Sequence, residues 1–359
     1  MRAIFLSLCF VLFLLPSGMA AAQDDIALPQ VENAPCQTSE CLRSALAKRI
    51  GRVIPPYSKL AANDNIEGFV SVQYTVGIDG HVKDIKLAEL IGPRYFADAT
   101  IETVQNWTFT PGLADGKAVE QTFDFSTIFN LRNGGTPGAR GLVINAYGKA
   151  VGLLREGKFD EAEAILKAVE AEPKLNFYER GMLGNAAALI AISKGEYVRA
   201  QELLRIPTDY YAWEFPPAVL KTMLATRVGA AVGAGNLAAA LVLATRYSKM
   251  SGVKADDPLL KQVAEMKAGV DAAPSFAMQG EVPQGQDISL DSFITYYSGL
   301  TFTNIVGSLD SMVIQCRSRT VKSKIVEKVE WRIPKDWGNC QVTITGAPRT
   351  KYQVVQFKD

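Results

Sequence analysis

The chain has 359 residues, of which 48% are hydrophobic and 21% charged, a composition that fits a folded protein with two or three domains. Lys and Arg number 38 and Asp and Glu number 37, so there is no basic excess to suggest a nucleic-acid partner. The single histidine argues against Ser-His or Cys-His catalysis and against a histidine-rich metal site. We therefore expect a non-enzymatic protein with no catalytic residues, no metal ligands and no cofactor.

The first 22 residues have the pattern of a secretory signal peptide. Arg2 precedes an uncharged apolar run from Ile4 to Leu15, and small residues follow at Ala20–Ala22. The run is shorter than the roughly 20 residues that a membrane-spanning helix needs. We expect cleavage before Gln23 and a periplasmic mature chain that does not span the membrane; the alternative is a segment retained as an anchor.

Four cysteines remain after this cleavage, and they fall into two local pairs. Four cysteines allow three pairings, and we favour the two pairings that close short loops, Cys36–Cys41 and Cys316–Cys340. Such bridges persist in an oxidising compartment. The spacing is not the CxxC type expected of a metal site.

Residues 23–53 are predicted to form a polar lead and then a short helix. Leu42, Leu46 and Ile50 recur at helical spacing between Cys41 and Ile54. Pro55-Pro56 ends this segment.

From Glu67 the hydrophobic pattern changes to a period of two, which predicts a strand with one buried face. Asp79-Gly80 predicts a tight turn into a second strand beginning at Val82. Helical spacing then returns from Phe96 to Trp107, and a last strand is predicted from Val119 to Phe129. The order strand, strand, helix, strand indicates a small α+β domain.

An ordered set of motifs in this stretch resembles the TonB C-terminal domain family. The set is Glu67-Gly68, the alternating strand, Asp79-Gly80-x-Val82, Asp84-Ile85, the helix ending in Trp107-Thr-Phe109-Thr-Pro111, and Asp115-Gly116-Lys117-x-Val119. The resemblance, over residues 54–131, implies a periplasmic domain whose last strand has a free edge. In that family the edge takes an extended segment of an outer-membrane transporter as an added strand.

The chain departs from the family pattern at its N-terminal side. It reads Pro55-Pro56-Tyr57-Ser58 where the family commonly has Tyr-Pro, and it lacks the long Pro/Lys-rich spacer of TonB. We therefore expect a binding module for envelope proteins or peptides, including an outer-membrane protein. A TonB-type energy transducer with a retained anchor is the first alternative. For the sheet itself, the alternative to peptide binding is a purely structural or self-pairing role.

The residues of the last strand predicted to contact a partner alternate along it. They are Val119, Gln121, Phe123, Phe125 and Thr127.

Residues 132–141 are Gly-rich and are predicted as a linker to helical repeats over residues 142–273. Glycines at 157, 195 and 235, spaced 38 and 40 residues apart, each open a similar motif. This pattern resembles a degenerate tetratricopeptide repeat, which implies a groove for proteins; a packed spacer is the alternative. An aromatic insertion over Tyr210–Phe215 holds three further candidate contact residues, Tyr210, Tyr211 and Trp213. A buried plug between repeats is the interpretation we favour for it.

Residues 274–287 are predicted as a second linker, and residues 288–359 as a small β domain. Its predicted strands are 312–317, 324–333, 341–345 and 352–357, stapled by Cys316–Cys340. The sequence thus predicts a multi-domain α+β protein with a TonB-like sheet domain, a helical-repeat domain and an all-β domain. A carboxylate-pair hydrolase is the remaining alternative, and it predicts a cleft with convergent acids of shifted pKa.

Overall fold

The computed structural model describes residues 46–359 except 52, 65, 115, 131–137, 173, 317–318 and 359. The predicted signal peptide and the Cys36–Cys41 pair lie outside the described residues. No helix in the described part is long and apolar enough to cross a membrane.

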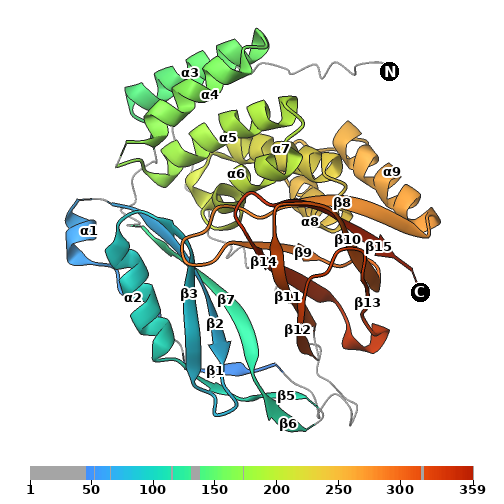
Figure 1. Cartoon of the computed structure of the whole chain (residues 1–359). Helices are drawn as coiled ribbons and strands as arrows, with labels where there is room; N and C mark the ends of the chain where they lie inside the picture. The colour runs from blue at the N-terminus through green and yellow to red at the C-terminus, as the bar shows by residue number, and fades with distance from the viewer. Residues whose placement is uncertain are drawn as a thin grey trace. The chain divides into compact units, whose positions relative to one another are not determined.

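The first domain is a three-stranded antiparallel sheet with a helix packed on one face (Figure 1). Its strand order is β3-β2-β7, with β2 at Gly68–Val76, β3 at Val82–Ile91 and β7 at Gln121–Phe129. Helix α2, Arg94–Gln105, covers the sheet, and the short helix α1 spans Lys59–Asn63. A small hairpin of β5, Gly112–Ala114, and β6, Lys117–Val119, precedes β7.

The core of this domain comes from the alternation seen in the sequence. The side chains of Val70, Val72, Tyr74 and Val76 cluster with buried residues of α2 such as Phe96. The predicted turn is present: Gly80 has a φ of +80°, and a Cβ there would lie 2.2 Å from the carbonyl oxygen of Phe109. Glycine is therefore required at this turn for both backbone conformation and space.

Two predictions for the first domain need correction. Residues 48–50 form a strand, β1, Lys48–Ile50, which pairs with β4, Thr108–Thr110, so the predicted helix is wrong over this part. Helical spacing there is outweighed by pairing with a segment distant in sequence. The predicted last strand is also split, because the chain leaves the β5–β6 hairpin at Glu120 before β7 begins.

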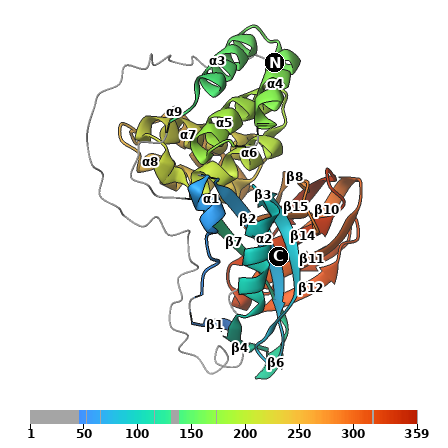
Figure 2. The same cartoon turned by 90° about the vertical axis from the view of Figure 1, so that its left-hand side faces the viewer.

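The middle of the chain is helical. Three helix pairs follow one another: α3, Gly141–Arg155, with α4, Phe159–Glu170; α5, Phe177–Ser193, with α6, Tyr197–Asp209; and α7, Pro217–Gly233, with α8, Leu237–Ser248 (Figure 2). Helix α9 spans Pro258–Ala272, and a 3-10 turn, Ala212–Glu214, separates α6 from α7.

The three motif glycines lie at the turns inside these pairs. Gly157, Gly195 and Gly235 have φ of +74°, +77° and +75°. This is the left-handed conformation in which helices often end, and glycine adopts it most readily. The predicted helical region is present, and each motif glycine lies between the two helices of a pair. Its assignment to the tetratricopeptide family stays a prediction.

The C-terminal part contains two four-stranded sheets that share one core. One has the order β13-β10-β15-β8, with β8 at Ser275–Glu281, β10 at Gly299–Val306, β13 at Glu330–Arg332 and β15 at Lys351–Phe357. The other has the order β12-β11-β14-β9, with β9 at Leu290–Ile294, β11 at Leu309–Cys316, β12 at Thr320–Lys324 and β14 at Cys340–Gly346.

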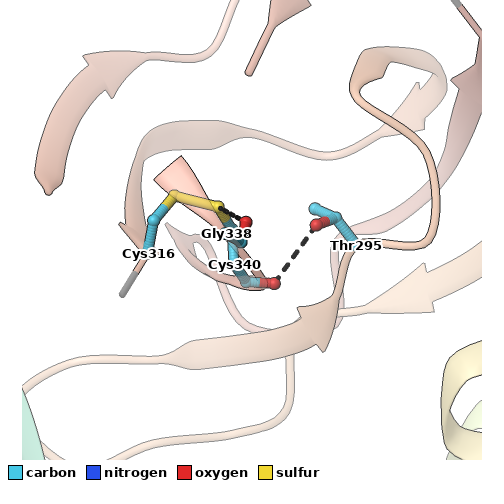
Figure 3. Close-up of a disulfide and its surroundings, with 4 residues drawn as sticks. All are labelled: Thr295, Cys316, Gly338 and Cys340. Atoms are coloured by element: carbon cyan, nitrogen blue, oxygen red, sulfur yellow. Dashed lines mark hydrogen bonds between the residues drawn. A yellow bond between two sulfur atoms is a disulfide. The ribbon is translucent and has the colours of Figure 1, made fainter. Parts of the chain in front are cut away.

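The predicted disulfide Cys316–Cys340 is present and joins neighbouring strands. The two residues are register partners in β11 and β14, with Cα atoms 4.0 Å apart. The Cys340 carbonyl oxygen also accepts a hydrogen bond of 3.3 Å from the Thr295 hydroxyl (Figure 3). A second bond, of 3.0 Å from the backbone N–H of Thr295, likewise ties the end of β9 to the bridge.

Two predictions for this part were wrong. β8 occupies half of the stretch predicted as a second linker, because pairing with β15 overrides its Gly- and Gln-rich composition. The strand predicted over 324–333 is interrupted between β12 and β13, where Lys328 has a φ of +62° and Val329 is exposed.

Candidate partner-binding edge and cleft

The two edges of the first sheet differ in what covers them. In the described part of the chain, β7 has β2 as its sole strand partner, so its outer edge carries no added strand. The edge of β3 is instead bonded at Leu87 and Ala88 by the segment that leads from β8 to β9. The uncovered outer edge therefore belongs to β7, which is the last strand of the domain and the strand for which a free edge was predicted.

We call residues 284–289 the strap, because backbone hydrogen bonds fasten it to β3. Gln286 N donates to the Ala88 carbonyl at 3.0 Å, and Asp287 N donates to the Leu87 carbonyl at 2.8 Å. The Asp287 carboxylate accepts from Leu87 N at 3.1 Å. These bonds occupy backbone groups of β3 with which an added strand would otherwise pair.

The residues of β7 predicted to contact a partner point mostly toward the core. Phe123 stacks with Tyr74 at 5.9 Å between ring centroids, and Phe125 meets Trp107 edge to face at 4.7 Å. Gln121 is 1% exposed, and its Oε1 accepts from Ala47 N at 2.7 Å. Gln121 is thus buried, and Phe123 and Phe125 are half-buried and pack against the core of the domain.

The other two predicted positions on this segment are half-buried. Thr127 lies on β7, and Val119 lies on the preceding strand β6 rather than on the free edge.

The side chains of β7 that alternate with the core residues line a polar cleft. Thr122, Asp124 and Ser126 face the second C-terminal sheet across two adjoining hollows of about 630 and 250 Å³. Both hollows are also lined by Gln284 and Gly285 of the strap. The facing wall is polar and includes Gln341 and Thr343 of β14 in the smaller hollow and Thr345 in the larger.

Acidic side chains outnumber basic ones in this cleft. The smaller hollow is lined by Glu89, Asp124, Glu202, Asp291 and one cation, Arg205. The larger hollow is lined by Asp84, Asp287 and Asp310 together with Lys86 and Lys322.

Burial raises the pKa of Asp291 on β9 to about 7. The nearby charge of Glu202 raises it further, and hydrogen bonds, the Tyr352 hydroxyl donor first among them, act in the opposite direction. A carboxyl group with this pKa exchanges its proton near neutral pH. Asp291 lines the smaller hollow together with Asp124, and the hydrolase alternative stays a prediction.

The aromatic insertion lies between the helices and the first sheet. Tyr211 is 1% exposed and stacks on Phe177 of α5 at 4.3 Å, while Tyr210 meets Phe69 of β2 edge to face at 4.9 Å. Tyr211 therefore cannot contact a partner, and the insertion is a plug, although it packs against the sheet rather than solely between repeats. Trp213 is 52% exposed.

Sequence reasoning missed the cleft-lining residues. The period of two along β7 defines two faces, and we predicted that the face with the aromatic side chains binds a partner. In the structure this face packs against Tyr74 and Trp107 of the domain core. The signal available in the sequence was Asp124, a charged residue in the middle of a strand. The contribution of Asp291, more than 160 positions away, has no counterpart in the local pattern.

Comparison with known proteins identifies the first domain. Residues 54–131 match the family described as Gram-negative bacterial TonB protein C-terminal. Protein TonB of Pseudomonas aeruginosa is 35% identical over 69 residues, which are 19% of this chain and 20% of that protein. The chain thus spans about a fifth of the length of this curated relative. The match describes this one domain.

Two solved structures are also similar to part of the chain. The solution NMR structure of the Pseudomonas aeruginosa TonB C-terminal domain is 26% identical and covers 27% of this chain and 92% of its own, with a TM-score of 0.23. The TonB2 protein from Vibrio anguillarum is 24% identical and covers 33% of this chain and 98% of its own, with a TM-score of 0.22.

Proposed function

We propose that this protein is a non-enzymatic periplasmic binding protein whose TonB-like domain captures an extended segment of an envelope protein along β7. The observation that carries the proposal is the unpaired outer edge of β7, in a sheet whose opposite edge strand, β3, is bonded to the strap at Leu87 and Ala88. An exposed edge presents backbone N–H and C=O groups that an extended peptide satisfies as an added strand. The partner class is an envelope protein, with an outer-membrane protein as the specific expectation.

The charge on β7 favours a foreign strand over a second copy of this chain. Asp124 lies midway along β7 and is exposed. If two β7 edges paired, this carboxylate would approach its own copy or other acids of the cleft, and like charges on paired strands are destabilising. The strap and the helices then serve as a scaffold that holds the edge of β7 in place.

A TonB-type energy transducer is the alternative, and the fate of the N-terminal apolar segment distinguishes it from a binding protein. A transducer needs the N-terminal apolar segment as an anchor, whereas a binding protein needs it only for export. N-terminal sequencing of the exported protein separates the two. A start at Gln23 supports the binding protein, and an intact Met1 supports the transducer.

A hydrolase is a second candidate because Asp291, with a pKa of about 7, lines the cleft together with Asp124. A carboxyl group with such a pKa suits general acid catalysis at neutral pH. Incubation of the purified protein with envelope polysaccharide, with Asp291→Asn as the control, tests this candidate. Reducing ends released by the wild type alone would favour the hydrolase; our proposal predicts none.

Site-specific photo-crosslinking in the native cell tests the proposed function. A photoreactive residue replaces Ser126 on β7 in one strain and Asp98 on α2, which lines neither hollow, in another. We expect the Ser126 position to crosslink to one extended segment of an envelope protein, identified by mass spectrometry, and the Asp98 position not to do so. Equal crosslinking from both positions, or crosslinks confined to a second copy of the chain, would contradict the proposal.

A further inference from the structure

The cleft beside β7 holds two carboxylates that have no cationic partner in the described part of the chain. Asp124 accepts a hydrogen bond from the Gln73 amide at 3.2 Å, and Asp291 accepts one from the Tyr352 hydroxyl. Asp124 is exposed on the edge strand, and Asp291 is half-buried on β9. The two thus come from different domains and line the same hollow.

The one cation of the smaller hollow is already committed to other acids. Arg205 on α6 forms an ion pair with Glu89 of β3 and, through Nε, another with Glu202 at 3.0 Å. Two carboxylates therefore share one guanidinium, and this trio keeps a net negative charge. Arg205 cannot neutralise Asp124 and Asp291 as well.

We infer that the segment captured on β7 is basic, and that one of its lysine or arginine side chains enters the cleft beside Asp124 and Asp291. This inference rests on the proposed function, because the added strand is what places the basic side chain. A strand paired with β7 presents alternate side chains to the face that Thr122, Asp124 and Ser126 share. That face is the wall of the cleft.

The lining of the cleft suits a cationic group and opposes an anionic one. An ammonium or guanidinium group needs acceptors for several N–H bonds. The side-chain oxygens of Ser126, Gln341 and Thr343 lie along the same hollow as the two carboxylates. Charge complementarity of this kind selects among partners more than it raises affinity in general.

Selection from a phage-displayed library of random peptides tests the inference on the mature, disulfide-bonded chain. Wild type, Asp124→Asn, Asp291→Asn and a control, Asp98→Asn, are used in parallel. Asp98 is an exposed acid on α2 that pairs with Arg94 at 3.0 Å, on the opposite face of the sheet from the cleft. Selected peptides are then synthesised with Lys, Gln or Glu at the enriched position, and once with N-methylated alternate amides.

We expect basic residues to be enriched, and the Lys peptide to bind about tenfold more tightly than the Gln peptide by fluorescence anisotropy. This ratio should fall to about threefold or less in Asp124→Asn and in Asp291→Asn, and it should be unchanged in Asp98→Asn. N-methylation should abolish binding in every protein, because it blocks strand pairing.

The outcomes separate the inference from the proposed function. Peptides without basic enrichment, or a Lys preference that survives in both cleft variants, would overturn the inference. Strand addition would still stand if N-methylation abolished their binding. If no peptide is selected, or N-methylated peptides bind equally well, the proposed function itself fails.

Discussion

Asp291 lines the cleft, and its protonation state affects the stability of the C-terminal domain. Its carboxyl faces Tyr352 of β15, Glu202 of α6 and the backbone N–H groups of Glu281 and Ser292. Because burial raises its pKa from 3.8 to about 7, the folded state prefers the protonated form. The stabilising contribution is complete below the ordinary pKa and is lost as pH rises through about 7.

We predict that Asp291→Asn flattens this pH dependence. The amide keeps the shape of the side chain and cannot ionise, so the variant should lose less stability than wild type between about pH 4 and pH 8. The thermal midpoint of the variant at the higher pH should exceed that of wild type by a few degrees. Parallel curves for the two proteins across this range would show that Asp291 is not the titrating group.

Single residues also show where sequence reasoning succeeds and fails. The conformation of Gly80 was predictable, because Asp-Gly between two alternating segments specifies a turn that needs positive φ. The burial of Gln121 was not, because its partner, the backbone N–H of Ala47, lies 74 positions away. Local conformational preferences can be predicted from a single sequence. The hydrogen-bond partner of a side chain that lies far away in the chain can be identified only from the folded structure.

At the scale of elements, the strap is what makes the two sheet edges unequal. Asp287 contributes its backbone N–H and its carboxylate to Leu87, and Gln286 bonds Ala88. Each such hydrogen bond contributes about 1 kcal/mol. Loss of the strap would leave the backbone groups of Leu87 and Ala88 on the outer edge of β3 without these partners.

We predict that Asp287→Ala weakens the strap and that Asp287→Asn does so less. Asparagine keeps a side-chain oxygen that accepts from Leu87 N, whereas alanine does not. Hydrogen–deuterium exchange of the β3 peptides should accelerate in the alanine variant by about fivefold, corresponding to about 1 kcal/mol. Exchange as slow as in wild type would mean that β3 is protected by something other than the strap.

The disulfide stabilises the C-terminal domain by restricting its unfolded chain. Cys316 and Cys340 are separated by 24 residues, and a closed loop of this size contributes about 3 kcal/mol. We predict that the double substitution Cys316→Ser and Cys340→Ser lowers the free energy of unfolding of this domain by that amount. Denaturant titration followed through Trp331 and Trp337, which pack against its core, measures it. Unchanged unfolding in the double variant would contradict the prediction.

The elements that sequence alone recovered are those with a strong local pattern. β2, β3 and α2 follow from a clear change of period and a glycine turn, and the helix pairs follow from repeated glycines. β1 and β8 were missed because each forms by pairing with a segment far away in the chain, β4 and β15 respectively. A tertiary pairing of this kind leaves no signature in local composition.

For the whole molecule, contacts between the domains set the geometry of the candidate site. The Glu67 carboxylate accepts from the backbone N–H of Phe177 at the start of α5, and Tyr210 packs against Phe69. The strap adds its bonds to β3 from the C-terminal side. These contacts leave β7 as the unpaired edge in the described residues and put a polar, acidic cleft beside it.

The central claim is that the outer edge of β7 is open in the free protein and is filled by a partner strand. Residue-resolved amide exchange by NMR on the mature chain, with and without a selected peptide, tests it most directly. The account predicts that alternate amides of β7 exchange rapidly in the free chain and are protected when the peptide binds, while β2 stays protected throughout. If every β7 amide is already protected in the free chain, or if bound peptide leaves the β7 amides unchanged, the account is wrong.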